Sequence, residues 1–396
     1  MKNKKILISG ASIAGPTLAY WLSHYGFDVI VTEKARELRL GGQNIDVKGP
    51  AREIAQMMGI EEKIRAANTT EIGTRFVDTA NKIVAEFPKG ESIGLTQELE
   101  ILRGDLVKIL YECSKEKVEY RFGDQITSVS QTDIAVNVSF ASGKEESFDI
   151  LISAEGIGSK TMELVFGSQP DFKYLGLYTA YLTIPKEPSD SKWARWCNAL
   201  SGIIYLMRPD NHGETRASVT FLATEDEYKG LSMEEQKDAL IQRIKGTGWE
   251  SDRITEGIKR SKDFYFERVS QVKASSWSRG RVAITGDAAW CATPIAGKGT
   301  DLAMAGAYIL AGELSRADTI EQAFRAYEDK MRPYVEKSQQ LPPGIPWVVY
   351  PRTKFGIFIL NRLVAAVGSK PVKWLVGKLS SGKKVPGKEI VLPDYK

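Results

Sequence analysis

Residues 8–17, with the sequence ISGASIAGPT, decide the fold of this chain. An apolar run, KKILISG, leads into them, and the segment GPTLAYWLSHYG and a second apolar run, FDVIVTEK, follow. The two runs predict short buried strands, and the segment between them predicts a helix that ends at Gly26. A strand, a glycine-containing turn, a helix and a strand in this order predict the β-α-β unit of a dinucleotide-binding fold.

The glycine turn departs from the fingerprint G-x-G-x-x-G at its middle position, where Ser12 stands. Gly10 supplies the tight turn and Gly15 the close packing of helix on strand. Position 12 needs only a side chain small enough for a pyrophosphate to approach the backbone. We therefore expect the turn to hold a dinucleotide through Gly10, Ser12, Ile13, Ala14 and Gly15.

An acidic residue ends the second predicted strand. Glu33 lies 18 residues after Gly15, where a carboxylate accepts hydrogen bonds from the ribose hydroxyls of an adenosine. We expect Glu33 and its neighbour Lys34 to line the adenosine site. A carboxylate repels a 2′-phosphate, which favours FAD or NAD over NADP as the molecule held in this turn. An S-adenosylmethionine site stays open at this point.

The composition indicates a globular protein of two domains. Of its 396 residues, 42% are hydrophobic and 26% are charged, and no run of 18 uncharged apolar residues occurs. The N-terminal sequence MKNKKILISG lacks the apolar core and cleavage site of a signal peptide, so we expect a cytoplasmic location. Cys113, Cys197 and Cys291 are far apart, which favours neither a disulfide framework nor a metal site.

Histidine is scarce in this sequence, which has only His24 and His212. Neither lies near a G-x-S-x-G or H-E-x-x-H motif, so Ser-His-Asp hydrolysis and zinc hydrolysis lack their usual base or ligands. We expect both histidines to be structural or solvated. The chemistry is therefore expected to come from a cofactor.

Positive charge gathers near the C-terminus. The net charge of the chain is +4, and residues 351–396 contain ten Lys and Arg but only two Asp and Glu. Residues 1–350 therefore carry a net charge of −4. An acidic body of this kind is not expected to bind nucleic acid. The apolar segment FGIFILNRLVAAVG predicts a helix that either packs between the domains or lies on an anionic membrane surface. We expect packing, with Phe355, Phe358, Leu363 and Val367 in a protein groove, so membrane contact is not expected.

The middle of the chain differs from its beginning. Residues 170–260 alternate between apolar and polar, as in YTAYLTIP and TRASVTFLAT, which predicts an antiparallel sheet with one face on a core. The segment RVAITGDAA then predicts another buried strand that ends at Gly286 and Asp287. A helix rich in small residues is expected to begin near Thr300.

The stretch RVAITGDAAWCATPIAGKGTDLAMAGAYIL resembles the second flavin fingerprint of the single-component FAD monooxygenases, the para-hydroxybenzoate hydroxylase-like family. The segments GGQNIDV, EILRGDLVKIL, DFYFERVSQVKASSWSRGRVAITGDAA and GAYILAGEL extend the resemblance over most of the chain. With them it is most similar to tetracycline-inactivating monooxygenases and polyketide hydroxylases. A helix beginning near Thr300 also directs backbone N–H groups at a site where reduced flavin gains negative charge.

The resemblance implies roles for particular residues. It places Asp287 on the ribityl chain of FAD and a proline- and glycine-containing loop beside the isoalloxazine ring. Arg103 is implied to contact the ribityl or phosphate region. The residues that the resemblance adds to the cofactor site are Arg39, Asp46, Arg103, Gly286, Asp287, Pro294, Gly297, Gly299 and Thr300.

One family motif is altered in this chain. The pattern D-G-x-x-S-x-x-R, which in relatives touches FAD and the nicotinamide donor, reads EGIGSKTM here. Glu155 replaces the aspartate and Met162 replaces the arginine, while Gly156 and Ser159 are kept. Methionine cannot replace a guanidinium that binds a phosphate or carboxylate. A nicotinamide donor is therefore expected, but the choice between NADH and NADPH stays open.

The resulting fold expectation is an α/β protein with a Rossmann-like FAD-binding domain, interleaved with an antiparallel-sheet substrate domain and closed by C-terminal helices. The expected FAD-binding domain comprises residues 1–72, 98–166 and 262–335. The expected substrate-binding domain comprises residues 73–97 and 167–261, and residues 336–396 form the C-terminal helical segment.

The resemblance implies an FAD-dependent monooxygenase that uses NADPH or NADH and O₂ to hydroxylate an aromatic or polyketide-like molecule, tetracyclines among the candidates. Reduced FAD would act through a C4a-hydroperoxide, so the flavin is the reactive centre and no side chain is assigned as catalytic. A monomer without metal or nucleic acid is expected. The alternatives are a flavin-dependent reductase or dehydrogenase without oxygen insertion, and a non-catalytic flavoprotein.

Overall fold

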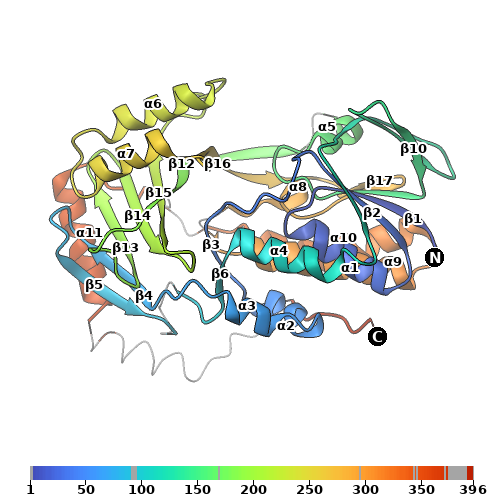
Figure 1. Ribbon diagram of the computed structural model, residues 1–396, viewed down its shortest axis with the longest axis horizontal. Coiled ribbons are helices and arrows are strands. Elements are labelled where there is room, and N and C mark those ends of the chain that lie inside the picture. The colour runs from blue at the N-terminus through green and yellow to red at the C-terminus, as the bar shows by residue number, and fades with distance from the viewer. Residues whose placement is uncertain are drawn as a thin grey trace.

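The structure, a computed structural model, describes residues 3–90, 96–167, 170–293, 296–341, 344, 347–369, 372 and 390–395. Figure 1 shows two lobes joined by long strands, with the first strand and helix in one lobe and α6 (Met233–Ile244), α7 (Ser251–Arg260) and α11 (Lys354–Val367) in the other. No helix of the described residues is long and apolar enough to cross a bilayer.

A six-stranded sheet forms the centre of the first lobe. Its order is β17 (Ser278–Arg279), β18 (Val282–Ile284), β11 (Ile150–Ser153), β1 (Lys5–Ser9), β2 (Asp28–Glu33) and β7 (Glu119–Phe122). All neighbours pair in parallel except β17 with β18. The predicted β-α-β unit is present, because α1 (Ala14–His24) connects β1 to its parallel neighbour β2.

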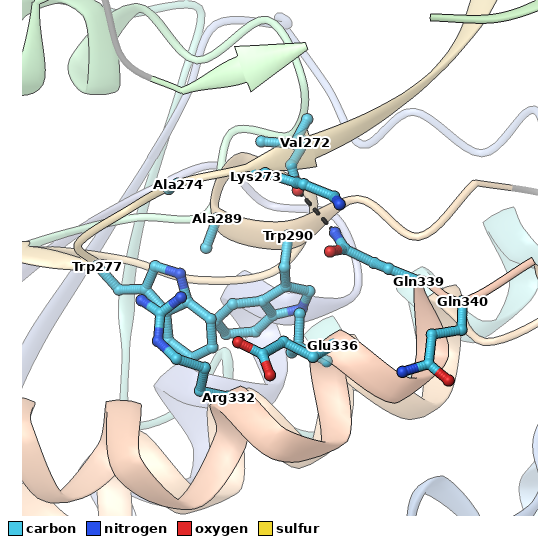
Figure 2. A pocket seen from close by; sticks show the side chains of 11 residues that line it. Val272, Lys273, Ala274, Trp277, Ala289, Trp290, Arg332, Glu336, Gln339 and Gln340 are labelled. Atoms are coloured by element: carbon cyan, nitrogen blue, oxygen red, sulfur yellow. Dashed lines mark hydrogen bonds between the residues drawn. The ribbon is translucent and has the colours of Figure 1, made fainter. Parts of the chain in front are cut away.

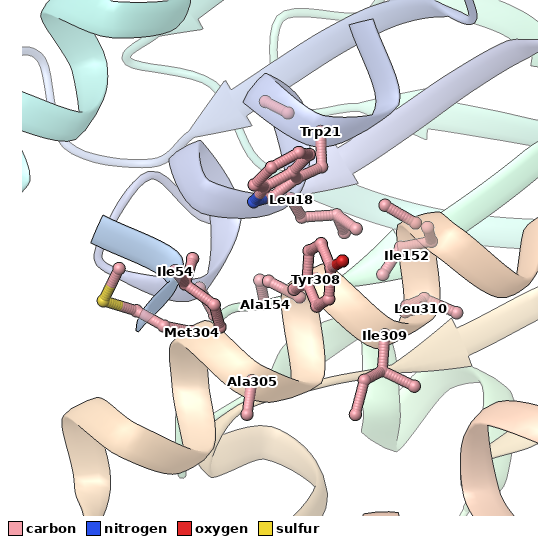
Figure 3. Close-up of a cluster of buried hydrophobic side chains, with 14 of the residues drawn as sticks. Leu18, Trp21, Ile54, Ile152, Ala154, Met304, Ala305, Tyr308, Ile309 and Leu310 are labelled. Atoms are coloured by element: carbon pink, nitrogen blue, oxygen red, sulfur yellow. The ribbon is translucent and has the colours of Figure 1, made fainter. Parts of the chain in front are cut away.

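Both faces of this sheet are buried, which explains the continuous apolar runs of its strands. Ile6 and Ile8 of β1 face α1 and α9 (Gly299–Arg316), whose side chains Leu18 and Tyr308 meet in the cluster of Figure 3. Leu7 faces the other way, onto a three-stranded sheet. That sheet consists of β8 (Ile126–Gln131), β9 (Val136–Phe140) and β10 (Glu145–Phe148).

The second lobe is built on the expected antiparallel sheet. Its order is β16 (Tyr265–Lys273), β12 (Asp171–Pro185), β15 (Glu214–Leu222), β14 (Ile203–Pro209), β13 (Trp193–Ala199), β4 (Gly73–Val77) and β5 (Ile83–Pro88). Only β13 and β4 pair in parallel. One face packs on α6 and α7, where Gly257 permits close approach, since a Cβ there would lie 2.3 Å from Ile184 Cγ2.

β16 begins after the domain boundary expected at residue 262 but still belongs to the sheet of the second lobe. It hydrogen-bonds β12 from the edge of the seven-stranded sheet, so the sheet continues past this residue before the chain returns to the first lobe at β17. The sheet continues past residue 262 because β12 and β16 are long strands that reach from one lobe to the other (Figure 1). The division into two domains itself stays a prediction.

The remaining elements connect the lobes or cover the first sheet. They are β3 (Asn44–Asp46), α2 (Gly49–Met57), α3 (Glu61–Ala66), β6 (Glu100–Leu102), α4 (Arg103–Ser114), α5 (Lys160–Phe166), α8 (Asp287–Trp290) and α10 (Ile320–Ser338). β3 and β6 form a two-stranded antiparallel ribbon that leads into α4. The helix expected after the glycine loop begins at Gly299, one residue before Thr300.

The C-terminal segment differs from expectation. α11 lies against β5 at the outer edge of the second lobe, not between the lobes (Figure 1). Phe355, Phe358, Leu363 and Val367 are 73%, 51%, 56% and 44% exposed, so the prediction that they fill a protein groove is wrong. The contact with β5 uses the small Gly368 instead, where a Cβ would lie 2.8 Å from Ala85 Cβ.

Candidate cofactor-binding site

The first turn has the geometry that a dinucleotide requires. Gly10 has φ +108°, and a Cβ there would lie 2.5 Å from the carbonyl oxygen of Ala154. A Cβ on Gly15 would lie 1.9 Å from the carbonyl oxygen of Gly10. Only glycine fits at these two positions, so helix α1 begins directly against the end of strand β1 and its N–H groups face the turn. Ile13 and Ala14 form the beginning of this helix.

Ser12 has a partner that a glycine could not hold. Its Oγ accepts a hydrogen bond from Arg103 Nη1 at 3.1 Å, and Arg103 Nη2 donates to the carbonyl oxygens of Arg39, at 3.0 Å, and Gly41, at 2.5 Å. Gly42 leaves room for this arginine, since a Cβ there would lie 2.5 Å from Arg103 Nε. The substitution at position 12 therefore fixes an arginine on the turn.

The charge of Arg103 points to an anion. Burial lowers the pKa of its guanidinium group, the nearby charge of Arg39 lowers it further, and among the described residues no carboxylate lies within ion-pair distance of it. A half-buried cation whose hydrogen-bond acceptors are all neutral is stabilised by an anionic ligand. The residues of the turn thus fit the pyrophosphate of a dinucleotide.

Glu33 occupies the position expected for the adenosine ribose. Its side chain is almost fully buried at the end of β2, with Oε2 accepting from the Ala11 N–H at 2.9 Å and Oε1 from the Ala35 N–H at 3.0 Å. Arg39 Nε lies 3.9 Å from Oε1. These contacts hold the carboxylate beside the turn. Lys34 points outward and is exposed, so its role stays a prediction.

The second fingerprint meets the first in space. Gly286 has φ +65° at the end of β18, and a Cβ there would lie 3.1 Å from Ala14 Cβ at the start of α1. Asp287 follows as the first residue of α8, with its side chain accessible to solvent. The surrounding protein nevertheless desolvates this carboxyl group and raises its pKa.

The glycine loop before α9 approaches the β3 ribbon. Gly297 has φ +57°, and a Cβ there would lie 4.0 Å from Lys48 Nζ, which also forms an ion pair with Asp46 at 3.3 Å. Thr300 is buried in the first turn of α9. Lys48 thus connects the implied Asp46 to this loop, and no motif signalled it. Pro294 lies outside the described residues, and Gly299 begins α9.

A half-buried acid, Glu267, lies close enough to Asp287 to interact with it electrostatically. Glu267 of β16 accepts a hydrogen bond from Tyr265 Oη at 2.7 Å, and Tyr181 lies beside Tyr265 on the neighbouring strand, with ring centroids 6.4 Å apart. Desolvation raises the pKa of Glu267 to about 7, and the negative charge of Asp287 adds to the rise. Strand alternation would have placed Tyr265 and Glu267 on one face, but nothing local indicated that this face is close to the second fingerprint.

A buried charged cluster joins the ribbon to the large sheet. Arg208 of β14 donates from Nε to Glu71 Oε2 at 2.8 Å and also binds Glu100 of β6. Both carboxylates are inaccessible to solvent, and burial raises the pKa of Glu100. Asn44 of β3 completes the cluster by donating to Glu100 at 3.1 Å. Because removing one partner would leave a buried charge alone, this cluster holds the two lobes in one relative position.

The two altered residues of the motif, Glu155 and Met162, make contacts within the protein. Glu155 accepts hydrogen bonds from Ser9 Oγ, from Ser159 Oγ at 2.8 Å, and from the Thr161 N–H and hydroxyl at 3.0 and 2.6 Å. Met162 is 4% exposed and belongs to the core of the first lobe. The segment therefore connects β1, β11 and α5, with the Met162 side chain packed in the core.

A separate cavity of about 350 Å³ opens between β16, α8 and α10 (Figure 2). Trp277 and Trp290 lie with ring centroids 4.4 Å apart, and the Arg332 guanidinium lies 4.6 Å from the Trp277 ring. Gln339 Nε2 closes one side by donating to the Val272 carbonyl at 2.7 Å. Ala289 and Trp290 of the second fingerprint line this cavity, but none of the residues assigned to the cofactor does, so we treat it apart from the cofactor site.

Comparison with known proteins agrees with this geometry. The family model described as FAD binding domain matches residues 3–340. The flavin-dependent monooxygenase of Legionella longbeachae serogroup 1 (strain NSW150) is 34% identical over 407 residues, covering 100% of this chain and 99% of that protein. The flavin-dependent monooxygenase eupH of Phoma sp is 35% identical over 432 residues, covering 100% and 98%.

Solved structures give the same result. The crystal structures of tetracycline destructases Tet(51) and Tet(55) match with TM-scores of 0.82 and 0.83 at 33% and 32% identity, each over 100% of both chains. HpxO of Klebsiella pneumoniae, complexed with FAD and uric acid, matches with a TM-score of 0.72 at 19% identity over 96% of both chains. This last likeness shows the fold alone.

Proposed function

Since this chain belongs to the FAD binding domain family and is a flavin-dependent monooxygenase, we propose that its substrate is an aromatic or polyketide-like small molecule of the tetracycline class. We propose further that it acts as a cytoplasmic monomer and accepts NADPH or NADH as a transient electron donor. The substrate class is supported by the similarity to tetracycline destructases over the whole chain. The resemblance seen in the sequence is thereby confirmed at the level of the family.

The residues present fit FAD from its adenosine ribose to its ribityl chain. Glu33 would hold the adenosine ribose, the turn at Gly10 and Gly15 together with Arg103 would hold the pyrophosphate, and Asp287 would hold the ribityl chain. The observation that carries this assignment is the meeting of the two fingerprints, where Gly286 approaches Ala14 although 271 residues separate them in the chain. When bound, FAD supplies the electron transfer and the activation of O₂.

The side chains near Asp287 give the proposed reaction site its shape and exclude water from it. Tyr181 and Tyr265 present aromatic rings that suit a flat substrate, and Glu267 holds a proton near neutral pH because its carboxyl group is desolvated. The Arg208 cluster keeps the large sheet in place opposite α8. These residues bind and orient a substrate, exclude water and keep one proton within the proposed reaction site.

Product analysis tests the proposal. The purified protein is incubated with tetracycline, O₂ and either NADPH or NADH, and the product is examined by mass spectrometry for a gain of one oxygen atom taken from isotopically labelled O₂. Donor oxidation without such a product would favour the reductase alternative, and no donor oxidation with any ligand would favour a non-catalytic flavoprotein.

Asp287→Ala tests whether oxygen insertion in this assay depends on the FAD site. The variant should lose at least about tenfold in FAD affinity, because a hydrogen bond to a charged group contributes about 1.5–3 kcal/mol. Oxygen insertion should fall with the flavin content measured from the absorption spectrum. Full FAD occupancy of the variant at low FAD concentration would contradict the assigned role of Asp287.

A further inference from the structure

Helix α11 carries an apolar stripe on the side that faces away from the protein. Phe355, Phe358, Ile359, Leu363 and Val367 are between 42% and 73% exposed. Phe355, Ile359, Leu363 and Val367 recur every four residues and Phe358 follows Phe355 by three, which places all five on one side of the helix. None of the residues of this helix is fully buried. A continuous exposed apolar face of this kind marks an interaction surface.

Positive charges flank this stripe and have no acidic partner. Arg352, Lys354 and Arg362 are exposed, and within the described part of the chain no carboxylate lies within ion-pair distance of them. The Arg362 guanidinium lies over the Phe358 ring, 5.1 Å from its centroid. In the sequence, no Asp or Glu occurs between Glu336 and Glu389. The exposed face of α11 therefore combines apolar side chains with cationic ones.

The shape and charge of this surface select its partner. A helix of 14 residues is about 21 Å long, which is too short to cross a bilayer but sufficient to lie flat in its headgroup region. A second copy of this chain would bring like charges together, whereas an anionic bilayer supplies negative headgroups around an apolar interior. We propose that the face of α11 formed by Phe355, Phe358, Ile359, Leu363 and Val367 docks the enzyme on an anionic lipid surface.

Vesicle flotation tests this proposal with the full-length flavoprotein. Vesicles of phosphatidylcholine alone are compared with vesicles of equal parts phosphatidylcholine and phosphatidylglycerol. The protein should float with the mixed vesicles, bind the neutral vesicles much less, and be released by high salt, because salt screens the attraction between Lys or Arg and lipid phosphate. Absence of binding to the mixed vesicles would overturn the proposal.

Two sets of variants identify the surface. Phe358→Ser combined with Leu363→Ser should reduce binding to the mixed vesicles at least about tenfold, since two apolar side chains no longer enter the bilayer. The control is Ile134→Ser, which removes an equally apolar side chain that is 79% exposed on the first lobe and should leave binding unchanged. Equal loss in both variants would overturn the proposal.

The oligomeric state in solution shows whether a second copy of the chain, and not a lipid surface, covers this face. Light scattering coupled to size-exclusion chromatography should show the same mass for the wild type and for the variant with Phe358→Ser and Leu363→Ser. A wild-type dimer that this variant converts to a monomer would assign the face to a second copy and overturn the proposal. Since both substitutions are on an exposed face, the melting temperature and FAD content should match the wild type, so any loss of binding is not a loss of folding.

Discussion

At the scale of single residues, Ser12 shows how a departure from a fingerprint becomes part of the site. The fingerprint glycine lets a pyrophosphate approach the backbone, and serine keeps this approach while adding an oxygen atom. That oxygen accepts from Arg103, which the carbonyl groups of Arg39 and Gly41 also hold. The turn thus has a fixed cation in addition to its backbone N–H groups.

Arg103 is predicted to contribute directly to FAD affinity. Arg103→Gln should weaken FAD binding by about 1.5–3 kcal/mol, which corresponds to roughly tenfold to a hundredfold in the dissociation constant, because a charge-assisted contact to phosphate is lost. The dissociation constant is measured by titrating FAD into the apoprotein and following flavin fluorescence. Arg325→Gln, at a side chain 73% exposed on α10, is the control and should bind like the wild type. Equal affinity for all three proteins would show that Arg103 only shapes the loop.

Glu267 is predicted to make stability depend on pH. Its folded-state pKa of about 7 lies above the value near 4.3 of an unfolded glutamate. A raised pKa means that the folded state binds the proton more tightly, so its contribution to stability is complete below about pH 4.3 and is lost as the pH rises through 7. Among the described residues, the titratable groups that interact with it are Tyr265, Tyr181, Asp287 and Cys291.

Glu267→Gln removes this titration. The variant should match the wild type at pH 4 and exceed its free energy of unfolding at pH 8 by about 1–2 kcal/mol, a value reduced from the full shift because the side chain is only partly buried. Urea unfolding at a series of pH values measures the difference. If the difference in the free energy of unfolding between wild type and variant did not change with pH, Glu267 would titrate as an ordinary exposed carboxylate.

At the scale of elements, helix α5 shows that a motif whose residues have changed can have a structural role. The glutamate at its entrance accepts four hydrogen bonds from β1 and from the helix itself, and Ser159 caps the helix by accepting from the Met162 N–H at 3.0 Å. The position that holds arginine in relatives points into the core. The helix is therefore a structural link between strands, and a nicotinamide donor must bind through other residues.

Met162→Arg is predicted to destabilise the protein without improving donor binding. It places a charge among buried apolar side chains, which costs about 3 kcal/mol or more when no partner is present. The melting temperature should fall, and the Michaelis constant for NADPH and NADH should not decrease. Lys160→Arg, at a side chain 54% exposed on the same helix, is the control and should leave both unchanged. A lower Michaelis constant in a stable Met162→Arg protein would show that the position reaches the donor.

At the scale of the whole molecule, the end of the chain returns to the first lobe. Tyr395 is buried against α9, where its ring contacts Gly312 and lies 5.3 Å from the ring of Tyr308. Its hydroxyl group donates to Glu313, and Tyr308 Oη donates to the Pro393 carbonyl at 2.8 Å. α9 presents its first turn to the flavin loop and packs on α1, so this contact supports the helix on which both fingerprints depend.

Tyr395→Ala is predicted to lower the free energy of unfolding by about 3 kcal/mol, because a buried aromatic side chain is removed. FAD retention should fall with it, since α9 loses support. Urea unfolding and the flavin content after gel filtration measure these effects. Val391→Ala, at a side chain 87% exposed in the same segment, is the control and should have no effect. An equally stable Tyr395→Ala protein would show that the contact contributes nothing in solution.

The sequence by itself determined the features that are encoded within short segments. Local periodicity and the positions of the glycines predicted the strand, turn and helix around Gly10 and Gly15 and the strand that leads into Gly286. They also placed the carboxylate of Glu33 at the end of β2. The resemblance carried by these segments then indicated the family and the cofactor.

Only the tertiary structure decided which distant segments meet. Glu267 lies near Asp287, and Arg208 binds Glu71 and Glu100, because sheet order and lobe packing bring these residues together, and neither depends on a local pattern. The same holds for α11, whose apolar periodicity is identical whether its stripe meets protein, lipid or solvent. A hydrophobic pattern specifies which side chains share a face, and only the packing of the whole chain specifies what that face contacts.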